Sequence, residues 1–336
     1  MNAGRRRYFF FLLLLGLGAV SFAAADLASF ARRQTVLAPT LFEVQPGSSL
    51  STISKQLEQQ KIITSATRFT LIVRIRRLAN RLQAGEYEFQ PGDTPQAIID
   101  QLVSGRIKQY QLTIPEGLTI REISRLMPSR LCQNGEFEQL ADDPALLKQW
   151  NIPAAYGEGY LFPSTYPYSK ATTCRQLVSQ MLKTFTEQFQ LASTTATTEA
   201  SLPLSRHELV TLASIIQKET GRLEEMPLIA AVLINRLRKG MRLECDPTVI
   251  YGLGDGFDGN LRKKDLLDAS SPYNTYQHRG LPPGPICNPG IMALKAAHAP
   301  APVDYLYFVS RNDGSHQFSA TYQDHHKAVQ RYQQRR

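Results

Sequence analysis

The stretch IIQKETG, residues 215–221, places one carboxyl group, that of Glu219, where a protein could use it as an acid. Treated as a helix, the segment has an apolar face of Leu209, Leu212, Ala213, Ile215 and Ile216 and an opposite face of Thr211, Ser214, Gln217 and Lys218. Glu219 falls on the apolar face. Apolar neighbours and the negative end of the helix dipole both disfavour an ionised carboxylate, so we expect a raised pKa for Glu219. A glutamate protonated near neutral pH suits general acid catalysis, whereas the plainer alternative is an exposed glutamate at a frayed helix end.

Capping signals define the helix that must position this carboxyl group. The sequence SRHE, residues 205–208, is typical of a capping box, in which Ser205 accepts from the first turn and Glu208 reaches back. We expect the helix to run to Thr220, with Gly221 ending it in the left-handed C′ position.

The N-terminus predicts the compartment. Three arginines within residues 1–7 precede the uncharged run 8–25, which as a helix would be roughly 27 Å long and could just cross a membrane. The arginines favour a cytoplasmic N-terminal tail and place everything after the run on the far side. We expect residues 8–25 to be an uncleaved anchor, followed by a polar tether over residues 26–40. The alternative is a cleavable signal peptide, since Ala23–Ala25 offers small residues for cleavage.

Four cysteines are spread along the chain without a C-x-x-C pair: Cys132, Cys174, Cys245 and Cys287. That spacing argues against a zinc ribbon or a thioredoxin-type site. Outside the cytoplasm an even number of cysteines can form disulfides. Chain order favours Cys132–Cys174 and Cys245–Cys287, although all three connectivities are open.

A strand–turn–helix pattern recurs as FEVQPGSSLSTISKQL (42–57), as YEFQPGDTPQAIIDQL (87–102) and, more faintly, as LTIPEGLTIREISRLM (112–127). Each copy has a short alternating strand, a glycine turn, a Ser, Thr or Asp cap and an amphipathic helix. A second helix at about 66–79 completes a strand–helix–helix–strand order that resembles a LysM domain, a family that binds N-acetylglucosamine-containing polymers. We therefore expect a LysM-like module over residues 41–105; the alternative is an α+β spacer that sets distance from the membrane.

The most specific strings lie downstream of Glu219: DPTVIYG (246–252), YNTY (273–276), GLPPGPICNPG (280–290) and YLYFV (305–309). With KETG and INRL, they resemble the endolytic murein transglycosylase family, also called YceG-like, over essentially everything after residue 40. The resemblance implies an α+β fold with a mixed catalytic domain over residues 106–336.

The resemblance also implies a function. Members cleave the β-1,4 bond between N-acetylmuramic acid and N-acetylglucosamine in nascent peptidoglycan strands and leave 1,6-anhydro ends, so the expected enzyme is a lyase with Glu219 as its catalytic residue. No cofactor or metal is expected. The expected partners are glycan strands, membrane lipid around the N-terminal helix, and peptidoglycan synthases. The protein would sit in the cell inner membrane as a single-pass protein, with its C-terminal domain in the periplasm, and would terminate strand elongation. A function of another class is a non-catalytic glycan-binding scaffold.

Further candidates for substrate contact lie in the same strings: Glu225, Asn235, Arg236, Glu244, Asp246, Thr248, Tyr273, Asn274, Thr275 and Tyr276. Several have plainer alternatives, because Glu225 could be a first-turn helix glutamate while Asn235 and Arg236 could bind helix carbonyl groups. The chain also departs from the family. Leu243-Glu244-Cys245 replaces the common Leu-Gln-Ser or Leu-Gln-Thr, which puts a contact from Glu244 in doubt. Ser164 replaces a common Asp, so Glu158 is the remaining candidate for a second acid in that aromatic loop.

Other classes of function are disfavoured. A net charge of +9 suits nucleic acid, anionic lipid or an acidic polymer, but the body of the chain has no RNP1-like segment, zinc-finger spacing or compact Lys/Arg block. No nucleic-acid partner is therefore expected. The adjacent His325 and His326 lack the i, i+4 spacing of a zinc-binding H-E-x-x-H helix.

Overall fold

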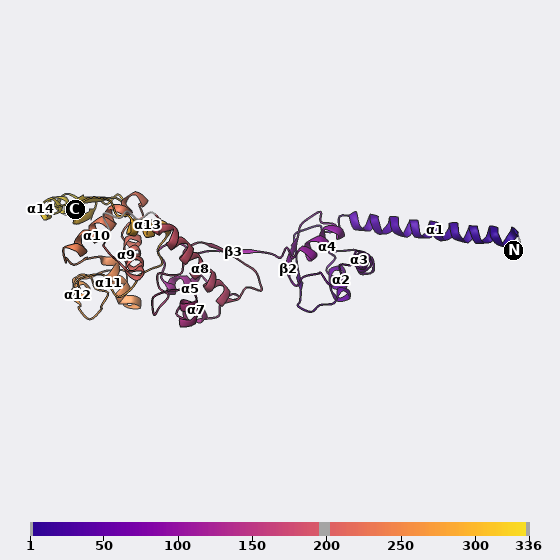
Figure 1. The fold of residues 1–336 in the computed structure, drawn as a ribbon, viewed down its shortest axis with the longest axis horizontal. Helices are drawn as coiled ribbons and strands as arrows, with labels where there is room; N and C mark the ends of the chain where they lie inside the picture. Colours follow the sequence, from indigo (N-terminus) through magenta and orange to yellow (C-terminus); the bar gives the residue numbers. More distant parts are fainter. Residues whose placement is uncertain (1–2, 195–201, 334–336) are drawn as a thin grey trace. The chain divides into compact units, whose positions relative to one another are not determined.

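A computed structural model describes residues 3–194 and 202–333 of the chain. Within these residues the fold is α+β, as predicted, with many helices (Figure 1) and small two-stranded sheets. The sheets pair β1 with β2, β3 with β4 and β5 with β6. The chain divides into two compact units. The first unit comprises residues 1–110 and 167–171, and the second unit comprises residues 111–166 and 172–336. The return of 167–171 to the first unit was not expected from the sequence.

Helix α1 (Ala3–Arg32) is apolar and long enough to cross a membrane over Tyr8–Arg32, 25 residues within which an 18-residue window has a mean hydropathy of 2.1. This is compatible with a single-pass anchor or with a signal sequence. The prediction of a tether from residue 26 is wrong for its first part, because the helix continues to Arg32. Phe30, only 4% exposed, joins the core of the first unit, so packing holds the last turns of α1 in helical form.

The first unit has the expected strand–helix–helix–strand order. Its elements after α1 are β1 (Thr40–Val44), α2 (Leu50–Gln59), α3 (Ala66–Ile75), β2 (Gly85–Phe89) and α4 (Pro95–Ser104). Strands β1 and β2 pair antiparallel, with Thr40 opposite Phe89 and Val44 opposite Gly85. Phe42, Tyr87 and Phe89 on these strands are fully buried among apolar helix residues. Helix α3 ends at Ile75, short of the predicted 79.

The three sequence repeats fold alike. Their turn glycines Gly47, Gly92 and Gly117 have φ of 79°, 92° and 79°, a left-handed conformation that strains other residues. Two residues later the hydroxyl groups of Ser49, Thr94 and Thr119 accept from the first turns of α2, α4 and α5. The periodicity was therefore a sound guide to local structure.

The chain from residue 110 is mainly helical. Its elements are β3 (Tyr110–Thr113), α5 (Ile120–Leu126), α6 (Glu136–Ala141), α7 (Pro144–Gln149), β4 (Thr165–Tyr168), α8 (Cys174–Ser193), α9 (Arg206–Glu219), η1 (Leu223–Glu225), α10 (Met226–Arg238), α11 (Asp246–Leu253), η2 (Gly254–Gly256), α12 (Lys263–Leu267), α13 (Ile291–His298), β5 (Tyr307–Ser310), β6 (His316–Ser319) and α14 (Tyr322–Tyr332). Helix α9 contacts α10, α11 and α13 and forms the centre of the second unit (Figure 1). Strands β5 and β6 pair antiparallel beside α14.

One of the two expected disulfides is present. Cys132 and Cys174 are bonded, with their Cα atoms 4.9 Å apart, and the bond ties the segment before α6 to the first residue of α8. The sequence separation is 42 residues, for which loop-closure entropy predicts a stabilisation of about 4 kcal/mol at most.

Replacing both Cys132 and Cys174 with serine is expected to lower the free energy of unfolding by about 2–4 kcal/mol, because the unfolded chain regains the entropy of an open loop. Urea denaturation of the full-length protein in detergent measures this loss. Dithiothreitol should destabilise the wild type similarly and leave the double variant unchanged. Alkylation of both thiols in the untreated native protein would show that the bond does not form.

Candidate active site

Helix α9 begins at a capping box and ends at Glu219, because the backbone of Thr220 is extended. The predicted capping box is present: the Ser205 hydroxyl accepts from the Glu208 N–H at 3.3 Å, and the Glu208 carboxylate accepts from the Ser205 N–H at 2.8 Å. At the other end Thr220 is extended, with φ −145° and ψ 143°. The prediction that Gly221 ends the helix in a left-handed conformation is wrong, since Gly221 has no positive φ. The carboxyl group therefore sits in the last helical residue.

Helix α9 is buried on both faces, which the amphipathic reading did not foresee. Thr211 and Ser214, expected on a solvent face, are 1% and 0% exposed. The Ser214 hydroxyl accepts from the Ile286 N–H at 3.0 Å, and the Gln217 side chain accepts from the Gly290 N–H at 2.9 Å. The polar face thus binds the Pro/Gly-rich loop 280–290 instead of water, because that loop supplies backbone donors.

Glu219 is half-buried and faces Cys245, Asp246 and Arg236. Burial raises its pKa to about 7, in the expected direction. A hydrogen bond from the Cys245 thiol opposes this rise, the charge of Asp246 adds to it, and the charge of Arg236 opposes it. Glu219 is therefore about half protonated at neutral pH, the state in which a carboxyl group can act as a general acid.

A buried network holds Cys245 beside Glu219. The Thr275 hydroxyl accepts from the Cys245 N–H at 2.9 Å and lies 2.8 Å from the Thr248 hydroxyl, which donates to the Cys245 carbonyl at 2.7 Å. Asn274 donates to carbonyl groups of the α12 segment, at 2.6 Å for Asp268. Thr248, Asn274 and Thr275 are each at most 2% exposed. The structure thus gives these three predicted substrate contacts internal partners, so they position Cys245 and the segment around it.

Asn235 and Arg236 bind backbone carbonyl groups, but these belong to other segments and not to the end of their own helix, as the plainer alternative held. The Asn235 amide donates to the carbonyl groups of Val303 at 2.8 Å and Tyr305 at 3.1 Å. The Arg236 guanidinium donates to the Leu306 carbonyl at 2.7 Å and pairs with the Glu244 carboxylate at 2.9 Å. These bonds tie the C-terminal segment to α10 and leave Arg236 close enough to act electrostatically on Glu219.

Glu225 is a structural carboxylate. It lies in η1 just before α10, is 8% exposed, and accepts from the His316 N–H at 2.9 Å and from its Nδ1 at 2.7 Å. Burial acts to raise the pKa of Glu225, but the bonds from His316 outweigh it and lower the pKa. A carboxylate that stays ionised and paired is unsuited to donate a proton.

The remaining predicted contacts reach the surface. Tyr276 donates to the Asp246 carboxylate at 2.7 Å, and Tyr273 packs its ring 4.9 Å from the ring of Tyr251. Asp246 and Glu244 are exposed. Tyr276, Asp246 and Glu244 lie at or beside the Cys245–Asp246 step that faces Glu219, so a hydroxyl group and carboxylates are available next to the acid. Tyr273 packs against Tyr251 of α11, the helix that begins at Asp246.

The predicted Cys245–Cys287 disulfide is wrong: both thiols are free and buried. The Cys245 thiol bonds Glu219, whereas the Cys287 thiol contacts the Ser214 carbonyl at 3.3 Å. Ser214 and Glu219 are five residues apart on α9, about 7.5 Å along its axis. The two thiols therefore contact α9 at different positions along its axis. The order of the cysteines in the chain does not predict these positions.

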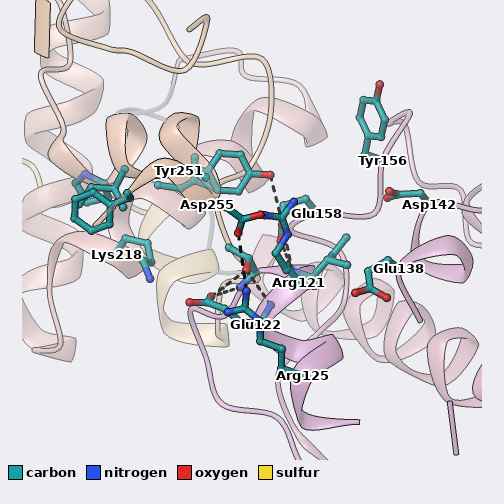
Figure 2. A pocket seen from close by; sticks show the side chains of 17 residues that line it. Arg121, Glu122, Arg125, Glu138, Asp142, Tyr156, Glu158, Lys218, Tyr251 and Asp255 are labelled. Carbon is teal, nitrogen blue, oxygen red and sulfur yellow. Dashed lines mark hydrogen bonds and ion pairs between the residues drawn. The ribbon is translucent and has the colours of Figure 1, made fainter. Parts of the chain in front are cut away.

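A cavity of about 730 Å³ adjoins the Glu219 region. Lys218, the residue before Glu219, and Pro247, the residue after Asp246, both line it, whereas Glu219 does not. Figure 2 shows Glu138, Asp142 and Tyr156 on one side of this cavity and Lys218 on the other.

Glu158, the remaining candidate for a second acid, lines the cavity. Its carboxyl group accepts from the Ile120 N–H at 3.2 Å and from the Tyr251 hydroxyl at 3.4 Å (Figure 2). It also accepts from the Asn288 amide at 3.0 Å. Burial raises its pKa to about 8, although the Ile120 and Tyr251 donors act to lower it. Glu158 is thus mainly neutral at pH 7, and its hydrogen bonds connect the segments of Ile120, Tyr251 and Asn288 around the cavity.

Asn288 is the residue that sequence reasoning missed. It is fully buried, accepts from the Leu161 N–H at 2.8 Å and donates to the Leu118 carbonyl at 3.0 Å as well as to Glu158. It lies within the GLPPGPICNPG string, where an amide flanked by apolar and proline residues was the available signal. Among residues 3–194 and 202–333, no group of three His, Cys, Asp or Glu side chains is placed to hold a metal ion.

Comparisons with known proteins show the family of this chain. The sequence profile of the YceG-like family matches residues 42–331. The chain is 33% identical over 312 residues to the endolytic murein transglycosylase of Bacillus subtilis (strain 168), covering 86% of this chain and 83% of that protein. It is 28% identical over 320 residues to the endolytic murein transglycosylase of Streptococcus pneumoniae (strain ATCC BAA-255 / R6), of which it spans 57%.

A solved structure shows the same similarity in three dimensions. A YceG-like protein from Listeria monocytogenes matches with a TM-score of 0.59 and 32% identity, covering 86% of this chain and 98% of that one. The matched family region contains both the α9 carboxyl group and the loops that enclose it. The chain belongs to the YceG-like family.

Proposed function

We propose that the protein is an endolytic peptidoglycan lytic transglycosylase with Glu219 as its catalytic residue. The observation that carries this proposal is the environment of Glu219: burial gives a pKa of about 7, and the Cys245 thiol bonds the same carboxyl group. The relatives named endolytic murein transglycosylase support the substrate class. Hydrolytic glycosidases usually need two carboxyl groups, whereas a transglycosylase can use one.

The reaction balances with this single group. The Glu219 carboxyl group donates its proton to the glycosidic oxygen as the bond to C1 of N-acetylmuramic acid breaks, so N-acetylglucosamine leaves with a free hydroxyl group. The carboxylate then takes the proton of the muramic C6 hydroxyl, whose oxygen bonds to C1 and forms the 1,6-anhydro ring. Glu219 ends protonated, as it began, and no water or cofactor is consumed. Tyr273, Tyr276 and Asp246 would contact the sugars beside it.

The N-terminal helix supports a location for this activity. As an uncleaved anchor, α1 would hold the protein in the cell inner membrane as a single-pass protein, with both folded units in the periplasm. The LysM-like module would then contact glycan close to the membrane, where synthases extend strands. Cutting at that place would terminate strand elongation.

Incubation of the full-length protein in detergent with purified glycan strands tests the proposal. Mass spectrometry should find new 1,6-anhydro-muramic ends at internal positions of the strands. A non-catalytic scaffold, the other function considered, would co-sediment with strands and leave their length unchanged. Reducing ends in place of anhydro ends would identify a hydrolase and contradict the proposed chemistry.

A further inference from the structure

The cavity beside Glu219 carries charges of both signs. Arg121, Arg125 and Lys218 line it together with Glu138 and Asp142. Arg121 and Arg125 are one turn apart on α5, while Glu138 lies on α6 and Asp142 follows it. In Figure 2 the two carboxylates lie apart from the arginines, toward Tyr156. A ligand that matches this wall needs a cationic and an anionic group.

The acidic side of the cavity has carboxylate oxygens that can accept further hydrogen bonds. The Oε2 atom of Glu138 is buried and has no hydrogen-bond partner among the described residues. Asp142 uses Oδ1 to accept from the Gly157 N–H at 2.8 Å. A buried carboxylate oxygen without a donor costs free energy, which a cationic ligand would recover. Glu158 is mainly neutral at pH 7 and adds little charge here, because burial raises its pKa to about 8.

The basic side of the cavity has positive charge that its carboxylates do not neutralise. Asp255 is the carboxylate that faces both arginines, at 2.5 Å from Arg121 and 4.0 Å from Arg125. The Glu122 carboxylate also lines this side, where it accepts from the Thr119 N–H at 2.8 Å. Arg121, Arg125 and Lys218 together outnumber the carboxylates of Asp255 and Glu122, so this side keeps a net positive charge. Both arginine side chains are more than half exposed, so an incoming anion can reach them.

The chemistry of the proposed substrate offers one group with both charges. The N-acetylated sugars of a glycan strand are neutral, so they give no reason for a charged wall. The peptide stem on muramic acid ends in a carboxylate and, before crosslinking, carries a free primary amine on its diamino acid. A volume of about 730 Å³ lies within the usual range for a small-ligand site.

We propose that this cavity binds the uncrosslinked peptide stem of the strand, with the stem's amine at Glu138 and Asp142 and its carboxylate at Arg121 and Arg125. The inference rests on the proposed function. Lys218 and Pro247 place the cavity next to Glu219, so a stem attached near the cut bond can reach it. Crosslinking turns the amine into an amide and removes its charge. The cavity therefore distinguishes strands whose stem amine is free and charged from strands in which that amine is acylated.

Three substrates test this: uncrosslinked strands with intact stems, the same strands with the stem amine acetylated, and strands stripped of stems by an amidase. The full-length wild type in detergent should show a kcat/KM at least about tenfold higher for intact stems than for acetylated ones, the size of one charge-assisted hydrogen bond. Glu138→Gln should bring this ratio close to one by slowing cleavage of intact strands. Asp142→Asn, which keeps an acceptor for Gly157, should reduce the ratio as well.

Glu187→Gln on α8, an exposed carboxylate outside the cavity, is the matched control and should keep the wild-type ratio. Equal cleavage of intact and acetylated strands by the wild type would overturn the inference while leaving the proposed function in place. So would an equal loss on all three substrates in Glu138→Gln, which would indicate a structural role. If the wild type releases no anhydro ends from any strand, the proposed function itself fails.

Discussion

Replacing Glu219 with glutamine is expected to lower the release of 1,6-anhydro ends by at least about 10³-fold, since general acid–base groups contribute roughly 10²–10⁴-fold and this group acts in both steps. Glutamine keeps the shape of the side chain but cannot donate and regain the proton. The variant should still fold and bind strands, because the glutamine oxygen can still accept from the Cys245 thiol. Muropeptide mass spectrometry measures activity, and thermal unfolding with strand co-sedimentation measures the rest.

A nearby carboxylate provides the control for this variant. Glu224 has a 72% exposed side chain and a loose ion pair with Arg222, at 3.8 Å. Glu224→Gln should therefore retain wild-type activity. Substantial release of anhydro ends by Glu219→Gln would show that another group supplies the proton and would remove the basis of the proposed mechanism.

The second large effect concerns pH. Glu219 must be protonated to act, so activity should be full well below its pKa and fall about tenfold per pH unit above about 7. At pH 9 the loss should be about 100-fold. The same sign applies to stability: a carboxyl group with a raised folded pKa stabilises fully below its unfolded value, and this contribution is lost as pH rises through about 7.

Substitutions of Cys245 should shift the basic limb of the pH–rate profile, which is the fall in activity above pH 7. The Cys245 thiol donates to Glu219 and lowers the pKa of that group. Cys245→Ala removes the donor, so the basic limb should shift to higher pH, whereas Cys245→Ser supplies a stronger donor and should shift it to lower pH. A pH–rate profile of each full-length variant measures the shift.

The other buried thiol is the control for the pH experiment. Cys287 contacts the Ser214 carbonyl at 3.3 Å, away from Glu219, so Cys287→Ser should leave the limb in place. Shifts in the same direction for both Cys245 variants would contradict the assigned hydrogen bond. A flat profile across pH 6–9 would contradict the assignment of Glu219 as the acid.

Short-range signals were reliable because the interactions behind them span only a few residues. The capping box of Ser205 and Glu208, the repeated glycine turns and the apolar N-terminal run all appear as predicted. The prediction of a tether from residue 26 was wrong because it ignored a long-range contact. The helix continues past residue 25 because Phe30 packs into the core of the first unit, and local sequence patterns do not reveal such packing.

The sequence by itself determined that Glu219 lies on the apolar face near the end of a helix, and it predicted a raised pKa while leaving an exposed glutamate as the alternative; burial in the folded chain decided between them. Only the tertiary structure decided what faces that group. Cys245 comes to Glu219 through bonds to Thr275, 30 residues away, and Asn288 and Glu158 meet across 130 residues. Such pairs depend on how buried polar groups find partners once the helices pack, and that is a property of the whole fold. For the same reason Cys245 and Cys287 are apart, and Asn274 and Thr275 are internal supports.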